Sequence, residues 1–237
     1  MRKFFLLLAS AAIILALVSC EKIRGKGDIT TEDRSVTGYT GISLALSGTV
    51  YYKQDSNYSL RISAQENVLE RIITEVDGNT LIVKLKPHVI LGQHEPIRIY
   101  ISAPSVSNLD VSGSGDIYAE NKLIGGDISV NISGSGSITI TNLEAGHFSA
   151  QISGSGSIKT LGGHTGEEDL KISGSGDIDQ QNVVSDYVYT STSGSGQTYV
   201  NAQKLLDVTI SGSGDVFYYG NPMINVHISG SGSLKKL

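Results

Sequence analysis

The chain has 237 residues and a formal net charge of −5, with 28 glycines, one cysteine and no tryptophan. Residues 105–237 hold six lysines, no arginine and thirteen carboxylates, a net of −7. We therefore expect no nucleic-acid partner, because phosphate backbones are bound by clustered lysine and arginine. A single cysteine also excludes an internal disulfide.

Residues 1–19 have the pattern of a lipoprotein signal peptide. Arg2 and Lys3 precede an apolar run that is shorter than the roughly 20 residues of a membrane span. Leu17-Val18-Ser19-Cys20 resembles the lipobox of bacterial lipoproteins. The resemblance implies cleavage before Cys20 and lipid attachment at that residue. The alternative is an ordinary secretory signal with an unmodified cysteine.

Lipidation of Cys20 predicts outer-membrane lipid as a partner, since several acyl chains anchor a protein stably. Glu21 stands where aspartate would mark retention in the inner membrane, so the outer membrane is the expected location. The cell-surface face and the periplasmic face both remain open.

Residues 20–38 are polar and contain glycine, which predicts a tether between the lipid and the folded body. Residues 39–104 show alternating apolar positions that are typical of β-strands. Asp77-Gly78-Asn79 is a strong turn signal between two of these strands. We expect residues 39–104 to form irregular first coils that cap one end of a larger array.

Residues 105–237 contain the pentapeptide Ser-Gly-Ser-Gly-(Asp/Ser/Gln) seven times, at spacings of 18 to 21 residues. The copies start at Ser112, Ser133, Ser153, Ser173, Ser193, Ser211 and Ser229. Such a period is typical of solenoids, in which each repeat buries its apolar face only against its neighbours. A flexible linker is the alternative for a Gly/Ser-rich segment. It is disfavoured because aliphatic residues keep fixed offsets on both sides of the motif.

The alternation assigns side chains to faces. If Val111 and Ile117 point inward, Gly113 and Gly115 are expected to point inward as well. Inward glycines suit a corner where backbone meets backbone, or a bend that needs positive φ.

The repeated motif, its aliphatic flanks and the lipoprotein start resemble the bacterial family described as "putative auto-transporter adhesin, head GIN domain", which is common in Bacteroidetes. The resemblance covers about residues 39–237. It implies an all-β, right-handed parallel β-helix-like solenoid with coils of about 18–21 residues. It implies little about activity.

No residues form a catalytic or cofactor-binding pattern. Gly-Ser-Gly is followed by strands, whereas phosphate-binding loops need a following helix. Asp116, Asp177, Asp179 and Asp215 are candidate ligands for structural calcium, which needs six to eight oxygen ligands in all. The alternative for these residues, and for the acidic run Glu167-Glu168-Asp169, is a solvated loop or turn.

Tyrosines near the later repeats offer a possible binding surface, since exposed aromatic rings on a rigid solenoid can hold glycans or an envelope protein. The alternative is cross-strand stacking that stiffens neighbouring coils. The candidates are Tyr187, Tyr189, Tyr199, Tyr218 and Tyr219.

The sequence thus predicts a non-enzymatic, lipid-anchored envelope protein that uses its solenoid for adhesion or ligand binding. A periplasmic structural or stress-related scaffold is the alternative, and a glycan-active enzyme is a distant third hypothesis.

Overall fold

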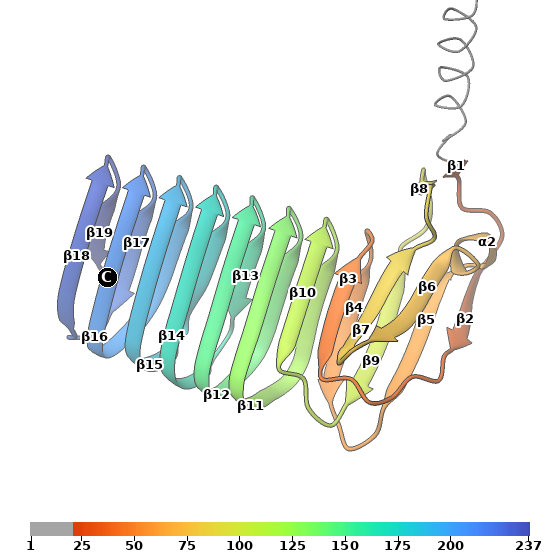
Figure 1. Ribbon diagram of the computed structural model, residues 1–237, viewed down its shortest axis with the longest axis horizontal. Coiled ribbons are helices and arrows are strands. Elements are labelled where there is room, and N and C mark those ends of the chain that lie inside the picture. Colours follow the sequence, from red (N-terminus) through yellow and green to blue (C-terminus); the bar gives the residue numbers. More distant parts are fainter. Residues whose placement is uncertain (1–20) are drawn as a thin grey trace, which may run out of the picture.

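The computed structural model describes residues 21–237, so the predicted signal peptide and Cys20 lie outside the described residues. The chain winds into an all-β solenoid of about six turns, which confirms the predicted fold class (Figure 1). Among residues 21–237, no helix combines the length and apolarity needed to cross a lipid bilayer.

Each coil has two faces that meet at the Ser-Gly-Ser-Gly corner. The leading face precedes the corner, and the trailing face follows it. Leading-face neighbours are, in order, β6 (Ile72–Asp77), β7 (Thr80–Leu85), β3 (Gly41–Ala45), β10 (Asn108–Gly113), the ends of β11 (Asp116–Gly134) and β12 (Ser137–Gly154), β14 (Gly163–Gly174), the ends of β15 (Asp177–Gly194) and β16 (Gln197–Gly212), and β18 (Met223–Gly230). Trailing-face neighbours are β2 (Ile29–Asp33), β5 (Ser59–Gln65), β9 (Arg98–Ala103), β4 (Thr49–Gln54), the starts of β11 and β12, β13 (Ser157–Thr160), the starts of β15 and β16, β17 (Asp215–Tyr219) and β19 (Ser233–Lys236).

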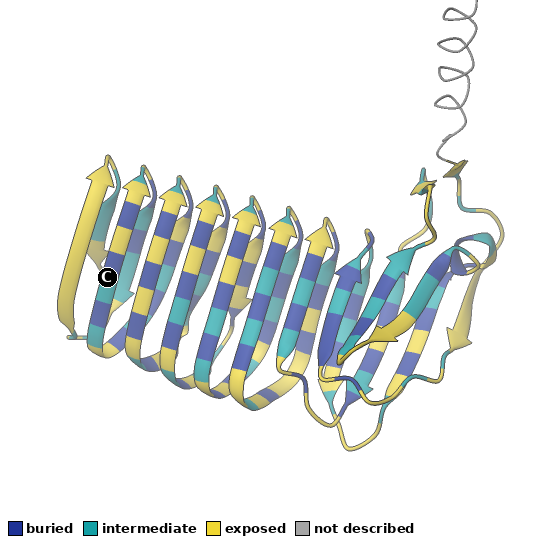
Figure 2. Cartoon of the chain, viewed as in Figure 1, coloured by how far each residue is buried: buried dark blue, intermediate teal, exposed yellow. Residues whose placement is uncertain are grey.

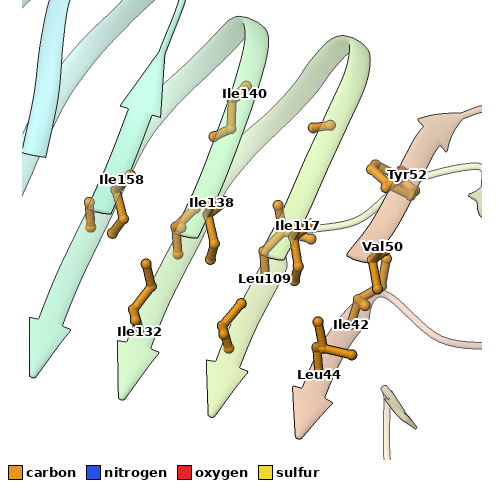
Figure 3. Close-up of a cluster of buried hydrophobic side chains, with 14 of the residues drawn as sticks. Ile42, Leu44, Val50, Tyr52, Leu109, Ile117, Ile132, Ile138, Ile140 and Ile158 are labelled. Atoms are coloured by element: carbon orange, nitrogen blue, oxygen red, sulfur yellow. The ribbon is translucent and has the colours of Figure 1, made fainter. Parts of the chain in front are cut away.

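The core lies between the two faces and consists mainly of apolar rows that run across the coils. Val50, Ile117, Ile138 and Ile158 follow one another in parallel register and are completely buried (Figure 3). Equivalent residues of neighbouring parallel strands stand about 4.8 Å apart, so identical aliphatic side chains stack directly. Burial alternates along most strands as the sequence pattern requires, whereas β2 and β18 are exposed throughout (Figure 2).

The two glycines of each motif have different structural roles. The second glycine is buried in six of the seven motifs, and a Cβ on Gly176 would lie 2.5 Å from the carbonyl oxygen of Gly156. The first glycine is not buried and adopts positive φ, from 108° at Gly113 to 133° at Gly134 and Gly230. The expectation that both glycines point inward is therefore wrong for the first one, because its positive φ turns the chain at the corner and ends the alternation.

The N-terminal end of the solenoid is capped. Strand β2 pairs antiparallel with β5, β5 pairs antiparallel with β9, and β6 pairs antiparallel with β7. The short helix α2 (Glu66–Leu69) adds two buried residues, Val68 and Leu69. We call residues 21–104 the capped end and residues 105–237 the repeat array. At the opposite end of the solenoid, β18 is exposed along its whole length.

The predicted tether over residues 20–38 is wrong for two parts of that segment, which form paired strands. Strand β1 (Glu21–Ile23) pairs in parallel with β8 (Val89–Leu91), and β2 extends the trailing face. Arg34 fixes the segment, because its guanidinium donates to the carbonyl oxygens of Ile72 at 2.9 Å and Leu69 at 3.2 Å. Polar composition hid this pairing, since β2 is an exposed strand whose main contribution is backbone hydrogen bonds.

Candidate functional site

One row of outward-facing side chains runs along the entire trailing face. Its members occupy equivalent positions on successive strands, and none of them is buried. In spatial order the row consists of Asp33, Arg61, Tyr100, Tyr51, Tyr118, Thr139, Lys159, Asp179, Tyr199, Phe217 and Lys235. We call it the trailing row.

Three tyrosines of the trailing row form a continuous stack. The ring centroids of Tyr100 and Tyr51 are 5.3 Å apart with planes 17° apart, and those of Tyr51 and Tyr118 are 5.8 Å apart with planes 16° apart. Register produces the stack, because strand spacing places outward side chains at a distance that suits offset aromatic packing. Tyr51 is therefore covered on both ring faces, whereas Tyr100 and Tyr118 end the stack.

A second aromatic pair lies in the repeat array. The rings of Tyr199 and Phe217 have centroids 4.7 Å apart and planes 10° apart, and the Lys235 ammonium lies 5.2 Å from the Phe217 centroid. Between the two aromatic groups stand Thr139 and an ion pair, in which Lys159 Nζ is 2.8 Å from Asp179 Oδ2.

The candidate tyrosines from the sequence do not form one strip. Tyr187 and Tyr189 are exposed on the leading face, and the Lys204 ammonium lies 5.5 Å from the Tyr187 ring. Tyr199 is on the opposite face, stacked against its neighbour. Tyr218 follows the inward row and packs against the core, while Tyr219 is exposed near the end of the trailing face.

A hollow of about 360 Å³ opens beside the first end of the tyrosine stack, and we call it the Tyr100 slot. It is lined by Asp33, Ser59, Arg61 and Tyr100. Arg61 Nε donates to Asp33 Oδ1 at 2.7 Å, and this bond holds the pKa of the Asp33 carboxyl below its usual range. Sequence reasoning missed the slot because two antiparallel strands outside the repeat supply most of its wall. The only local signal was the alternation of Tyr100 with Ile99 and Ile101.

The four calcium candidates each contact their own neighbours. Ser137 Oγ donates to Asp116 at 2.5 Å, and the Gln197 backbone N–H donates to Asp177 at 2.9 Å. Asp179 pairs with Lys159. Asp215 accepts from Ser233 Oγ at 2.6 Å and Lys235 at 2.9 Å, and these bonds lower the pKa of its carboxyl. Within residues 21–237, no three acidic, histidine or cysteine side chains come close enough to hold a metal ion.

Glu168 differs from the expected solvated loop. It lies in the inward row between Phe148 and Val188 and is completely buried. Ser185 Oγ donates to its Oε1 at 2.7 Å, while Oε2 has no hydrogen-bond partner. Burial raises the pKa of the Glu168 carboxyl to about 8, so the group is protonated at neutral pH. The repeat register could have predicted the burial of Glu168, because a residue aligned with Phe148 must point inward.

The fold of the chain is similar to that of several solved structures. The chain resembles a crystal structure of a putative adhesin from Bacteroides fragilis, with 26% identity over 91% of this chain and 100% of that one, and a TM-score of 0.87. Two Parabacteroides distasonis structures show the same fold over 92% of this chain and 100% of theirs. One is described as a putative adhesin (20% identity, TM-score 0.76) and the other as a putative lipid binding protein (23%, 0.78).

Two sequence comparisons complete the picture of related proteins. The search of curated proteins finds no match to the chain. The sequence profile described as "putative auto-transporter adhesin, head GIN domain" matches residues 38–222, which is most of the described solenoid. The chain belongs to this family.

Proposed function

We propose that this protein is a non-enzymatic, lipid-anchored component of the outer membrane that binds a ligand or partner through the trailing face of its solenoid. The carrying observation is the trailing row, in which aromatic and charged side chains are held in fixed order outside a continuously hydrogen-bonded sheet.

Rigidity supports this proposal. Every coil of the array pairs in parallel with the coil before it, and the buried glycines hold adjacent corners in backbone contact. Side chains on such a scaffold are ordered before a ligand arrives, so binding costs little additional conformational entropy. The stacked rings of Tyr100, Tyr51 and Tyr118 are restricted further by one another.

The arrangement of charges favours binding over catalysis. Asp177 and Asp179, two carboxylates that lie two residues apart on β15, are occupied by a backbone N–H and by Lys159. Catalysis by two carboxylates needs one protonated acid and one ionised base or nucleophile that face a shared substrate. The carboxyl of the array whose pKa is raised belongs to Glu168, which is completely buried in the core.

An anchor at Cys20 would hold the capped end near the membrane. Glu21 begins β1, and this strand is paired with β8. The last coils of the repeat array lie at the opposite end of the solenoid from β1 (Figure 1).

Proteinase K treatment of intact cells tests the proposal, with a periplasmic protein as control and a Cys20→Ala variant beside the wild type. We expect digestion of the solenoid while the control survives, and loss of membrane attachment in the variant. Protection until the outer membrane is permeabilised would instead support the alternative, a periplasmic scaffold. Unchanged attachment of the variant would contradict the lipid anchor.

A further inference from the structure

The Tyr100 slot has an open aromatic wall. One face of the Tyr100 ring is covered by Tyr51, and the other borders the hollow, leaving Tyr100 41% exposed. Arg61 is the next residue in the row and is placed to cover that second face. Its guanidinium turns instead to Asp33, and the cation–π contacts found among residues 21–237 involve Lys204 and Lys235 rather than Arg61.

The wall is also stiff. Tyr100 is backed by two further rings, so a ligand that displaced it would have to disturb the Tyr51 and Tyr118 stack as well. The hollow of about 360 Å³ lies within the range of about 300–1,000 Å³ typical of small-molecule sites.

The polar groups of the slot define the ligand chemistry. Asp33 supplies a carboxylate acceptor, Arg61 supplies guanidinium donors, and Ser59 supplies a hydroxyl that is 2.7 Å from the Ser102 hydroxyl. Because the charges of Arg61 and Asp33 cancel, the slot favours a neutral ligand over an ion. A ligand must then combine an apolar face for the tyrosine with hydroxyl groups on its edge.

We propose that the Tyr100 slot binds a pyranose residue of a neutral glycan. The C–H face of the sugar stacks on Tyr100, and ring hydroxyls bond to Asp33, Arg61 and Ser59. This inference rests on the proposed function, in that it names the ligand class of the trailing face.

Two other features of the described residues fit this role less well. A hollow of about 400 Å³ is lined by Glu32, Arg34 and Lys86 among others, but it has no aromatic wall, and Arg34 is engaged with backbone carbonyls. The exposed edge of β18 offers apolar side chains such as Val226, yet nothing in the structure shows what covers it.

Isothermal titration of purified residues 21–237 with neutral methyl pyranosides tests the assignment. Variants Tyr100→Ala and Arg61→Ala should each weaken binding about tenfold or more, which corresponds to about 1.4 kcal/mol. The matched control Tyr189→Ala removes an exposed aromatic ring from the leading face, outside the trailing row, and should bind like the wild type. Circular dichroism on all variants confirms that they fold.

Two further binding experiments with polymers identify the source of the sugar. One uses polysaccharide from the envelope of the producing cells, and the other uses a mucin as a foreign surface. Binding to either polymer that Tyr100→Ala abolishes supports the assignment. The assignment is overturned if the wild type binds none of the pyranosides and neither polymer. It is also overturned if Tyr100→Ala binds as tightly as the wild type. Proteinase K shaving is independent of these titrations, so failure of the ligand class and failure of the proposed function are distinguishable.

Discussion

The repeat array and the capped end use the same coil for different purposes. In the array, each coil repeats the residues of the coil before it, and backbone contacts between glycines set the spacing. In the capped end, antiparallel strands carry large side chains that differ from strand to strand, and there the Tyr100 slot opens. Repetition thus gives the solenoid stiffness, whereas departure from repetition gives it a candidate binding site.

The largest effect is expected from a glycine of the array. Gly176→Ala should destabilise the protein by about 3 kcal/mol or more, because the new Cβ would meet the Gly156 carbonyl oxygen and Ile152 Cγ2 at 2.6 Å. Urea denaturation measures the loss. Gly126→Ala is the control, since its Cβ would meet nothing within 4 Å. Equal stability of the two variants would contradict the close backbone contact.

A buried carboxyl in the array should make stability depend on pH. The pKa of the Glu168 carboxyl is about 8 in the folded protein, whereas in the unfolded chain the carboxyl has its ordinary pKa of 4.5. Unfolding therefore releases a proton between these values, and stability falls by about 1.4 kcal/mol per pH unit as pH rises through this window.

Glu168→Gln removes this dependence. Denaturation from pH 4.5 to 8 should show nearly equal stability of variant and wild type at the acidic limit. At pH 7 the variant should be more stable by about 2–3 kcal/mol. A constant difference across the window would show that Glu168 is not buried as described.

Two arginines of the capped end should differ in how much they contribute to stability. Arg34 has a side chain only 15% exposed and holds backbone carbonyls, so Arg34→Ala should cost about 2 kcal/mol. Arg61 is in an exposed pair with Asp33, and Arg61→Ala should cost less than about 1 kcal/mol. Thermal unfolding of both variants gives the ranking. The reverse order would mean that β2 is not fixed through Arg34.

The array could be predicted from sequence because its offsets are constant. Ile117, Ile138 and Ile158 follow their motifs at one distance, and the structure places them in one buried row. The repeat period and the alternation of apolar residues are local properties of the chain, so they can be read from the sequence without knowledge of the fold. The right-handed coiling implied by the family resemblance stays a prediction.

The candidate site could not be predicted in the same way. Tyr100 and Arg61 become neighbours through an antiparallel pairing between segments that share no repeat, and Asp33 arrives from a segment that looked like a tether. Glu168 was hidden for another reason, since three consecutive acids indicate solvent while its register indicates the core. The acidic composition predicted an exposed Glu168, whereas the strand register predicted a buried one, and in the structure Glu168 is buried.

The most direct test of the central claim compares the two aromatic groups in one sample. Nuclear magnetic resonance of protein with ¹³C-labelled tyrosine rings, assigned by single Tyr→Phe variants, would follow each ring during titration with neutral methyl pyranosides. The account predicts shifts of the Tyr100 signals, smaller shifts for Tyr51 behind it, and unchanged signals from Tyr187, Tyr189 and Tyr199. Shifts confined to tyrosines of the array, or no shift of Tyr100 at saturating sugar, would contradict it.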